Sequence, residues 1–420
     1  MKRRLLTRLL VPVLLAASLL PLPAVVNAQT SYTVNAGDSL YKIARQFQVT
    51  VEQIKTQNGL KNDGIYVGQV LSIPTPGSIP AGAPGRGSAM IVGYYTDKED
   101  NLASSAWSAT THLRSLSWLA PFWFRLNQDD ATDIEKAGSF TELEARQLVR
   151  RAHSQGVPVI PVIHNFLYPD KSLTKDLVTR MMATPESRAA CIGNIVELLR
   201  YYGFDGVNMD LEGIRVSDRD NLSKFYQELG DSLRARGYTF SVAIPAKSTD
   251  SMHIKWSAPY DYQAIGRAAD KVVLMMYNEH GFPGSGAGPV SSIGFNQAVV
   301  EFARTQMPSR KIILAEPVFG FDFNLDTTRY AYLSHEMAMQ RVRDYKAIPV
   351  FDETSQTPYY KYTDPATGQR HEVWYENSAS LNSKLNLVRQ YGLSGVALWR
   401  LGMEDPKIWS TIDQKVRVLR

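Results

Sequence analysis

From residue 89 onward, short apolar segments of strand length alternate with longer segments in which apolar residues recur every three or four positions. This alternation is typical of parallel βα units, in which each strand is followed by a helix that covers the sheet. Eight such units predict an α/β fold, a (β/α)8 TIM barrel. The eight expected strands are residues 90–95, 117–124, 158–165, 206–212, 239–245, 271–277, 311–319 and 395–401.

The interval between the last two expected strands is too long for one βα connection. Within residues 322–393, the segments 350–352, 359–363 and 371–376 have the pattern of hairpin strands, and 378–391 has that of a helix returning to the barrel. The sequence therefore predicts an α+β insertion before the last strand, which would deepen a cleft at the C-terminal face of the barrel.

The N-terminal part of the chain has a different organisation. Residues 31–74 predict a small strand-helix-helix-strand module, with too few residues for a large core. Residues 75–88 are rich in Pro, Gly, Ala and Ser and predict a linker. The expected domains are therefore a small module at 31–74, a linker at 75–88 and the barrel at 89–420.

The first 28 residues have the composition of an export signal. Lys2, Arg3, Arg4 and Arg8 precede an apolar run at 9–20, and Ala28 ends a small-residue cleavage site. The alternative is an uncleaved membrane anchor, although the run is short for a span of about 20 residues. We expect secretion, with no stable membrane span after signal removal.

Charge and cysteine content narrow the function classes. The net charge is +5, and four of these charges lie in the signal segment, so composition does not favour a nucleic-acid partner. Cys191 is the only cysteine, which rules out an intramolecular disulfide. Its apolar neighbours predict a buried helical thiol and not a nucleophile.

The chemistry is concentrated in the expected strand at 206–212. Val207, Met209 and Leu211 alternate with Asn208, Asp210 and Glu212, so one face is apolar and the other carries two carboxylates and an amide. Buried unpaired carboxylates are costly, which favours a functional site over ordinary core. A wet edge strand and an acidic calcium loop remain alternatives, although the spacing and the closing Glu of a calcium loop are missing.

Residues 205–212, Asp-Gly-Val-Asn-Met-Asp-Leu-Glu, closely resemble the Asp-Gly-x-Asp-x-Asp-x-Glu signature of glycoside hydrolase family 18. Asn208 departs from the Asp that chitinases carry there. Residues 275–278 (Met-Met-Tyr-Asn) and 397–402 also resemble family motifs, and 371–376 and 384–388 resemble the branch of spore-cortex-lytic and cell-wall N-acetylglucosaminidases. The resemblance covers essentially all of 89–420.

In this family the resemblance implies substrate-assisted catalysis, in which the acetamide carbonyl of the sugar attacks the anomeric carbon. Glu212 would then be the general acid and later the base, Asp210 would orient the acetamide N–H, and Tyr277 would hold the acetamide oxygen. Barrel active sites collect at the C-terminal ends of strands. The expected substrate-binding residues at these ends are Asn208, Tyr94, Trp123, Met275, Asn278 and Trp399.

The small module resembles a LysM domain. Tyr-Thr-Val-x-x-Gly-Asp-Ser-Leu opens it, Asn58 lies in its middle, and Gly-Gln-x-Leu-x-Ile-Pro closes it. The resemblance implies binding of N-acetylglucosamine-containing glycans in a shallow groove. The groove residues would be Gly37, Asp38, Ser39, Leu40 and Ile65. Ser39 and Asp38 would also serve as simple helix caps.

Together these patterns predict a secreted, retaining β-N-acetylglucosaminidase that acts on peptidoglycan of the cell wall or spore envelope. The alternatives are a chitinase or chito-oligosaccharide hydrolase, a catalytically silent lectin, and a structural envelope protein. Both carboxylates are retained, which argues against the lectin. We expect a monomer without cofactor. A metal site is not expected either, because His335-Glu336 and His371-Glu372 lack the second His of a zinc-protease helix.

Overall fold

The computed structural model describes residues 30–35, 38–47, 51–60, 64–73, 87–97, 102–167, 172–173 and 175–420. The chain divides into two compact units, residues 1–85 and 86–420. The predicted signal at 1–28 and most of the predicted linker lie outside the described residues. Among the described helices, none combines the length and the apolar character needed to cross a bilayer.

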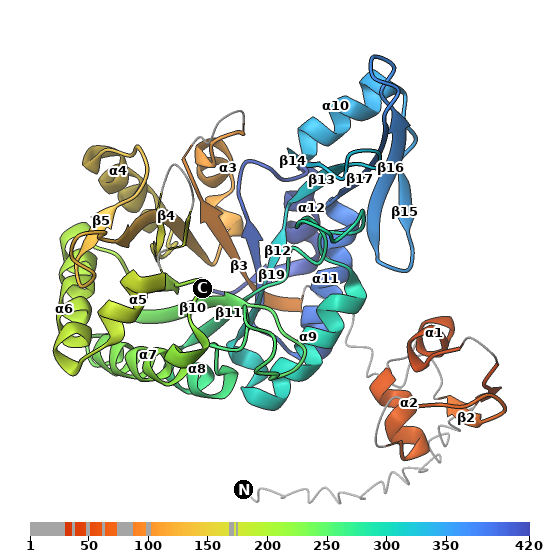
Figure 1. Ribbon diagram of the computed structural model, residues 1–420, viewed down its shortest axis with the longest axis horizontal. Coiled ribbons are helices and arrows are strands. Elements are labelled where there is room, and N and C mark those ends of the chain that lie inside the picture. The colour runs from red at the N-terminus through yellow and green to blue at the C-terminus, as the bar shows by residue number, and fades with distance from the viewer. Residues whose placement is uncertain are drawn as a thin grey trace, which may run out of the picture. The chain divides into compact units, whose positions relative to one another are not determined.

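The larger unit is a closed barrel of parallel strands (Figure 1). Each strand pairs with its neighbours in parallel, and pairing of the first two strands closes the ring. This confirms the predicted (β/α)8 fold. The barrel strands are β3 (Gly87–Tyr95), β4 (Trp118–Leu126), β6 (Val162–His164), β9 (Gly206–Asp210), β10 (Thr239–Pro245), β11 (Lys271–Met275), β12 (Ile312–Pro317) and β18 (Gly395–Trp399).

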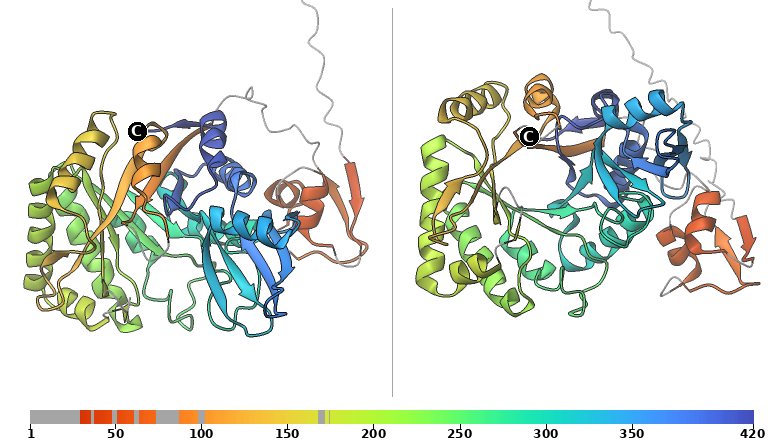
Figure 2. Two further views of the ribbon diagram at one scale, coloured as in Figure 1. Left: turned by 90° about the horizontal axis from the view of Figure 1, so that it is seen from above. Right: turned by 45° about the horizontal axis from the view of Figure 1, so that its top comes forward.

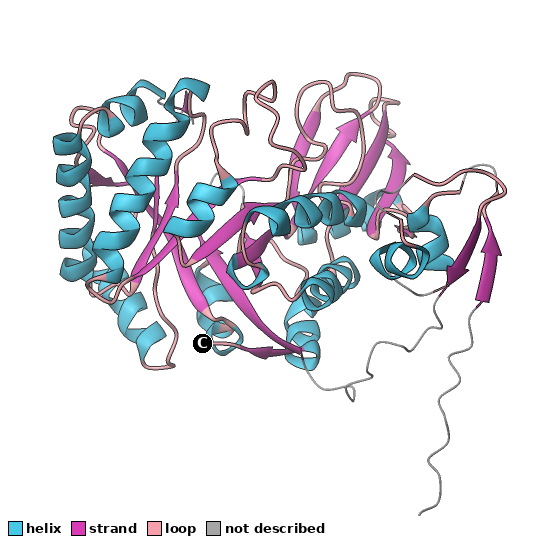
Figure 3. Ribbon diagram, turned by 90° about the horizontal axis from the view of Figure 1, so that it is seen from below, coloured by secondary structure: helices cyan, strands magenta, loops and turns pink. Residues whose placement is uncertain are grey.

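Helices cover the outside of these strands, as the colouring by secondary structure makes visible (Figure 3). Their local signals were readable in the sequence: Thr141 forms a capping box with Glu144, and Leu222, Phe225 and Leu229 are buried on one helix face. Cys191 is buried in a helix, as predicted. The helices are α3 (Ala106–Thr111), α4 (Glu142–His153), α5 (Lys175–Met182), α6 (Pro185–Tyr202), α7 (Arg219–Arg234), α8 (Tyr262–Ala268), α9 (Ile293–Gln306), α11 (Ser378–Tyr391) and α12 (Lys407–Lys415).

Four short strands flank the barrel. β5 (Ile134–Lys136) pairs antiparallel with β4, and β19 (Val416–Val418) adds to the outer edge of β3. β7 (Phe166–Leu167) and β8 (Ser172–Leu173) form a two-stranded ribbon after β6. Each is too short to carry a sequence pattern of its own, and the sequence did not predict them.

The predicted α+β insertion is present and contains more strands than expected, together with an additional helix. It forms a separate five-stranded antiparallel sheet with one helix, and it stands out from one side of the barrel (Figures 1 and 2). The expected strand 311–319 is in fact two strands, because β12 ends at Pro317 and Phe319 begins the insertion sheet. The insertion contains β13 (Phe319–Asn324), β14 (Tyr330–Ser334), α10 (His335–Tyr345), β15 (Val350–Asp352), β16 (Thr357–Thr363) and β17 (Arg370–Tyr375).

A buried ionic cluster ties the insertion to the barrel. Lys384 on α11 donates to Glu376 Oε2 at 2.7 Å, directly after β17, and lies 3.4 Å from Glu316 Oε2 on β12. Burial raises the pKa of Glu316 to about 7, and the Lys384 ammonium opposes that rise. Because an unpaired buried charge is costly, this cluster fixes the exit of the insertion relative to the barrel strand.

The small unit has the predicted βααβ order. β1 (Thr30–Thr33) pairs antiparallel with β2 (Val70–Ile73), and α1 (Leu40–Gln46) and α2 (Val51–Asn58) lie between them in sequence. Asn58 links helix and strand, because its amide donates to Ile54 O and Ser72 O and accepts from Ser72 N. The Asn58 side chain thus satisfies the hydrogen-bonding groups of the backbone where α2 meets β2.

Candidate active site

Strand β9 carries the acidic residues into the barrel. Val207 and Met209 point outward into the core under the helices, which leaves Asn208 and Asp210 on the inner face. The strand ends at Asp210, two residues earlier than predicted, so Glu212 lies in the following turn. Asn165 holds that turn by accepting from Glu212 N and donating to Glu212 O, both at 2.9 Å. Glu212 is therefore positioned through its backbone by the neighbouring strand end.

Two adjoining cavities meet at Glu212. The first, of about 410 Å³, is bounded by insertion residues Phe319, Phe321 and Tyr332, and we call it the insertion-side cavity. The second, of about 560 Å³, contains Trp256 and is called the Trp256 cavity. Glu212, Tyr277 and Asn278 line both, whereas Asp210 lines only the insertion-side cavity. A ligand that spans both cavities would therefore pass beside Glu212.

Aromatic rings form the floor of the insertion-side cavity. Trp399 contacts Phe122 at 5.5 Å and Tyr277 at 6.4 Å between ring centroids, and Tyr94 packs edge-on against it at 5.2 Å. Phe122 and Phe166 complete the wall. Flat apolar rings beside a few polar groups suit a sugar, whose ring face is apolar and whose edge is polar.

The two carboxyl groups lie in an environment that disfavours their charge. Burial raises the pKa of Glu212 to about 7. Burial also raises the pKa of Asp210 well above its usual value, and the neighbouring Glu212 carboxylate adds to this rise. Asp210 Oδ1 is buried without a hydrogen-bond partner among the described residues. The pair can therefore hold a proton near neutral pH and still offer one oxygen that lacks a donor.

His164 lies next to Asp210 across the β6–β9 pairing and was not identified from the sequence. Its ring stacks on Phe122 at 4.1 Å, and its Nδ1 accepts from Phe166 N at 3.0 Å. Burial lowers the pKa of His164 to about 3, so the ring is neutral. Its position at a strand C-terminus beside Asn165 was the available signal.

Most of the predicted barrel residues line the cavities. Asp210 and Trp399 line the insertion-side cavity, Met275 lines the Trp256 cavity, and Asn278 lines both. Asn278 also adopts a left-handed backbone with φ 62°, a strained conformation that tends to occur at functional positions. Sequence reasoning missed six aromatic residues that lie on β7, on loops, on α9 and on the insertion: Phe166, Phe321, Tyr332, Trp256, Phe282 and Phe295.

The predicted position of Trp123 in the substrate site needs correction. Its side chain is 1% exposed and stacks on Phe140 at 4.6 Å, in the outer core between barrel and helices. The pairing of β4 with β6 shifts register between Phe122 and Phe124, as at a β-bulge, and this leaves Phe122 as the inward ring. The prediction that Trp123 contacts substrate is therefore wrong, and Phe122 is the ring that lines the cavity.

Asn208 and Tyr94 lie one layer below the cavities, and their predicted contact with substrate stays a prediction. Both are buried, and neither lines either cavity. Asn208 accepts from Tyr94 OH at 3.3 Å and donates to Ser241 Oγ at 2.7 Å. These bonds fix Asn208 as a neutral support beneath Asp210.

In the small unit, the predicted groove residues fall into three groups. Asp38 accepts from Asn35 N at 2.7 Å and Tyr32 OH at 2.8 Å, which lowers its pKa, and Ser39 Oγ caps the helix by accepting from Lys42 N. Leu40 is buried in the module core, so a glycan contact by its side chain is wrong, while Ile65 is half-buried. Gly37 lies outside the described residues.

The loop after β11 closes tightly on the insertion at Gly281. A Cβ added there would lie 2.1 Å from the Phe321 ring, and its φ of +104° is also unfavourable for other residues. We expect Gly281→Ala to destabilise the protein by about 1–3 kcal/mol by overpacking, measured as a lower midpoint of denaturant unfolding. Gly284→Ala is the matched control, because Gly284 has φ +86° but nothing within 4 Å. Equal midpoints would contradict the Phe321 contact.

No group of three His, Cys, Asp or Glu side chains that could hold a metal is found in the part of the chain that the structure describes. The lining of the insertion-side cavity supplies two buried carboxyl groups, a tyrosine hydroxyl and an aromatic floor. A protonated carboxylic acid in such a setting can donate a proton to a leaving group.

Comparison with known proteins identifies the family of each of the two units. The family model for "Glycosyl hydrolases family 18" matches residues 91–404, and that for the LysM domain matches residues 32–74. The cortical fragment-lytic enzyme of Bacillus subtilis (strain 168) is 29% identical over 440 residues, which cover 93% of this chain and 98% of the relative.

Two solved structures extend the comparison. The Bacillus cereus spore cortex-lytic enzyme SleL is 26% identical with a TM-score of 0.72, over 93% of this chain and 87% of that one. A chitinase from Chromobacterium violaceum ATCC 12472 is 26% identical with a TM-score of 0.71, over 78% of this chain and 99% of that one. The chain therefore belongs to glycosyl hydrolase family 18 and is a glycoside hydrolase with an N-terminal LysM domain.

Proposed function

We propose that this protein is a retaining β-N-acetylglucosaminidase that hydrolyses peptidoglycan by substrate-assisted catalysis. One observation supports this above all. A proton-holding Glu212, an Asp210 oxygen without a donor and the Tyr277 ring line the same aromatic-floored cavity. An N-acetylated sugar offers a glycosidic oxygen that can take the proton of Glu212, an acetamide N–H that can donate to Asp210, and an acetamide oxygen that can accept from Tyr277.

In the first step, the acetamide carbonyl oxygen of the bound sugar attacks its own anomeric carbon. The glycosidic C–O bond breaks, and Glu212 gives its proton to the departing oxygen, which leaves as a hydroxyl. Asp210 accepts a hydrogen bond from the acetamide N–H, which satisfies Oδ1 and stabilises the positive charge that develops on the acetamide group. Tyr277 donates its hydroxyl to the acetamide oxygen.

In the second step, the Glu212 carboxylate takes a proton from water as the water attacks the anomeric carbon. Attack from the face opposite the acetamide oxygen restores the original configuration, because two inversions in sequence give retention. The acetamide is re-formed, and Glu212 is again protonated. No protein nucleophile is needed.

The lining of the two cavities supports an assignment of the two sides of the scissile bond. Only the insertion-side cavity contains Asp210, so the sugar whose acetamide reacts binds there on the Trp399 floor. The leaving sugar then occupies the Trp256 cavity, where Trp256 and Phe282 are 61% and 49% exposed. Glu212 lies between them, as a general acid must.

Peptidoglycan is favoured as the substrate by the relatives and by the LysM domain. A relative that matches over 98% of its length is called a cortical fragment-lytic enzyme, and a solved neighbour is a spore cortex-lytic enzyme. We infer that the protein acts outside the cell, at the wall or spore envelope, as a monomer.

A chitinase remains the second candidate, because a solved chitinase shares the barrel with a TM-score of 0.71. Digestion of purified spore cortex, vegetative peptidoglycan and chitin in parallel, with mass analysis of the new reducing ends, separates the two. We expect N-acetylglucosamine reducing ends from peptidoglycan, and proton NMR at early times should show the β-anomer first. Cleavage of chitin alone, or an initial α-anomer, would contradict the proposal.

The pH dependence of kcat follows from Glu212. Its pKa is raised to about 7 by burial, so the acid form that protonates the leaving group is lost as pH rises through that value. We expect kcat to fall about tenfold per pH unit above neutrality, because the deprotonated enzyme lacks a general acid. Initial rates measured from pH 4 to 9 on a soluble N-acetylglucosamine oligomer test this. A plateau that extends from neutral pH to pH 9 would contradict it.

A further inference from the structure

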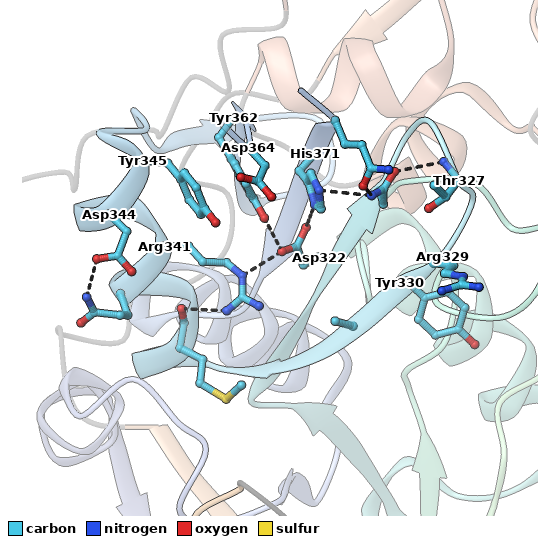
Figure 4. Close-up of a pocket in the computed structure, with 15 residues that line it drawn as sticks. Asp322, Thr327, Arg329, Tyr330, Arg341, Asp344, Tyr345, Tyr362, Asp364 and His371 are labelled. Carbon is cyan, nitrogen blue, oxygen red and sulfur yellow. Dashed lines mark hydrogen bonds and ion pairs between the residues drawn. The ribbon is translucent and has the colours of Figure 1, made fainter. Parts of the chain in front are cut away.

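The insertion carries a cavity of about 710 Å³ that is separate from both catalytic cavities (Figure 4). It lies between the five-stranded sheet and α10. Phe321 lines the insertion-side catalytic cavity, whereas its neighbour Asp322 lines this one. Successive residues of a strand point to opposite faces, so the two cavities lie on opposite sides of β13. We call it the rear cavity.

A buried carboxylate organises the wall of the rear cavity. Asp322 is 4% exposed; its Oδ1 lies 2.7 Å from His371 Nδ1, and its Oδ2 accepts from Arg341 Nε at 2.8 Å and from Tyr362 OH at 2.7 Å (Figure 4). Three side chains from α10, β16 and β17 are thereby fixed in position. A site built in this way loses little conformational freedom when a ligand binds.

The same wall presents stacked rings. Tyr345 stacks on Tyr362 with centroids 4.1 Å apart, and Tyr362 stacks on His371 at 4.6 Å. Both faces of Tyr362 are covered, which makes Tyr345 the ring at the end of the stack. A half-buried tyrosine held flat at the side of a polar cavity is a suitable platform for a sugar ring.

The remaining lining is polar and of mixed charge. Asp344 and Asp364 add to Asp322, and Arg329 adds to Arg341, so neither sign dominates. The guanidinium of Arg329 is exposed and has no ion pair or hydrogen bond among the described residues. Three carboxylates disfavour a phosphate or nucleotide, and the charged lining disfavours an apolar ligand. Hydroxyl groups, which both donate and accept, fit this mixture.

We propose that the rear cavity is a second saccharide-binding site, which holds a short stretch of the same N-acetylated polymer that the catalytic cleft hydrolyses. Its volume lies within the roughly 300–1,000 Å³ typical of ligand pockets. The proposal rests on the proposed function only in that the substrate is a glycan. A polymer bound at both sites stays near the cleft after each cut, whereas a short oligomer cannot span them.

The test uses the full chain with Arg329→Gln and Tyr345→Ala combined. Both side chains lie outside the Asp322 hydrogen bonds and outside the catalytic cavities. The control is Trp107→Ala, since Trp107 is 67% exposed and lines none of the cavities described above. Retention on insoluble chitin and on peptidoglycan is measured in a Glu212→Gln background, and turnover in the active background. The soluble comparison substrate is the N-acetylglucosamine trimer.

We expect the double variant to lose about tenfold in retention and in turnover on both polymers, with trimer turnover within twofold of wild type. Unchanged retention on both polymers overturns the proposal. An equal loss on the trimer overturns it as well, because the change would then act through the cleft. Loss on peptidoglycan but not on chitin would identify a peptide as the occupant and also overturn it. Retention is measured without turnover, so failure to hydrolyse glycans would contradict the proposed function alone.

Discussion

Glu212→Gln is expected to lower kcat on peptidoglycan fragments by roughly 10²–10⁴-fold, the range that a positioned general acid contributes. Glutamine keeps the shape of the side chain but cannot give up a proton to the glycosidic oxygen. The residue should stay in place, because Asn165 holds it through its backbone N and O. The affinity for a non-hydrolysed oligosaccharide, measured by calorimetry, should therefore change by less than about threefold.

The matched control for this variant is Glu279→Gln. Glu279 also lines the Trp256 cavity, but its two oxygens accept from Ser292 N at 2.7 Å and Ser292 Oγ at 2.9 Å. Its carboxylate is thus hydrogen-bonded to Ser292, the N-cap residue of α9, and kcat of Glu279→Gln should fall only severalfold. If Glu212→Gln retained near wild-type turnover while Glu279→Gln lost it, the proton donor would have been misassigned.

Asp210→Asn is expected to reduce kcat by roughly 10²–10³-fold, because a neutral amide no longer balances the positive charge on the reacting acetamide. The same change should stabilise the fold at neutral pH. Asp210 is 6% exposed, and burial holds its folded-state pKa above the unfolded value. Ionising a buried, partly unpaired carboxylate opposes folding, by about 1–3 kcal/mol for an unsatisfied polar group.

The sign of this effect can be checked against pH. Below the unfolded pKa of aspartate, about 4, the carboxyl group is protonated in both states, and the two proteins should unfold at similar temperatures. As pH rises toward 7, the wild type bears the increasing cost of ionisation and Asp210→Asn does not, so the variant should unfold at the higher temperature. A variant that is less stable at pH 7 would show that Asp210 is stabilised in the free protein.

The sequence was most informative where a function depends on one continuous segment. Asp210 and Glu212 were found because Val207, Met209 and Leu211 alternate with three polar residues along one continuous segment. Helix α11 was predicted with its observed bounds, because its capping residue and apolar stripe are both local. The eight βα units were recognised for the same reason.

Errors arose where the direction of a side chain depends on a neighbouring strand. Phe122 and Trp123 are adjacent aromatic residues at one strand end, and the sequence indicated Trp123 as the ligand contact. The register shift against β6 leaves Phe122 facing the cavity and Trp123 facing the helices. Alternation from Trp118 and Ala120 would have indicated this, since both face inward with Phe122.

By itself the sequence determined the barrel, the LysM domain and the two carboxylates, because periodicity and short motifs are properties of neighbouring residues. Only the tertiary structure decided that Glu212 lies between two cavities and that the insertion residues Phe321 and Tyr332 line one of them. It also decided that Asp322 lines a third cavity. Cavities are bounded by segments far apart in the chain, and their position depends on how loops and sheets pack, which no local pattern encodes.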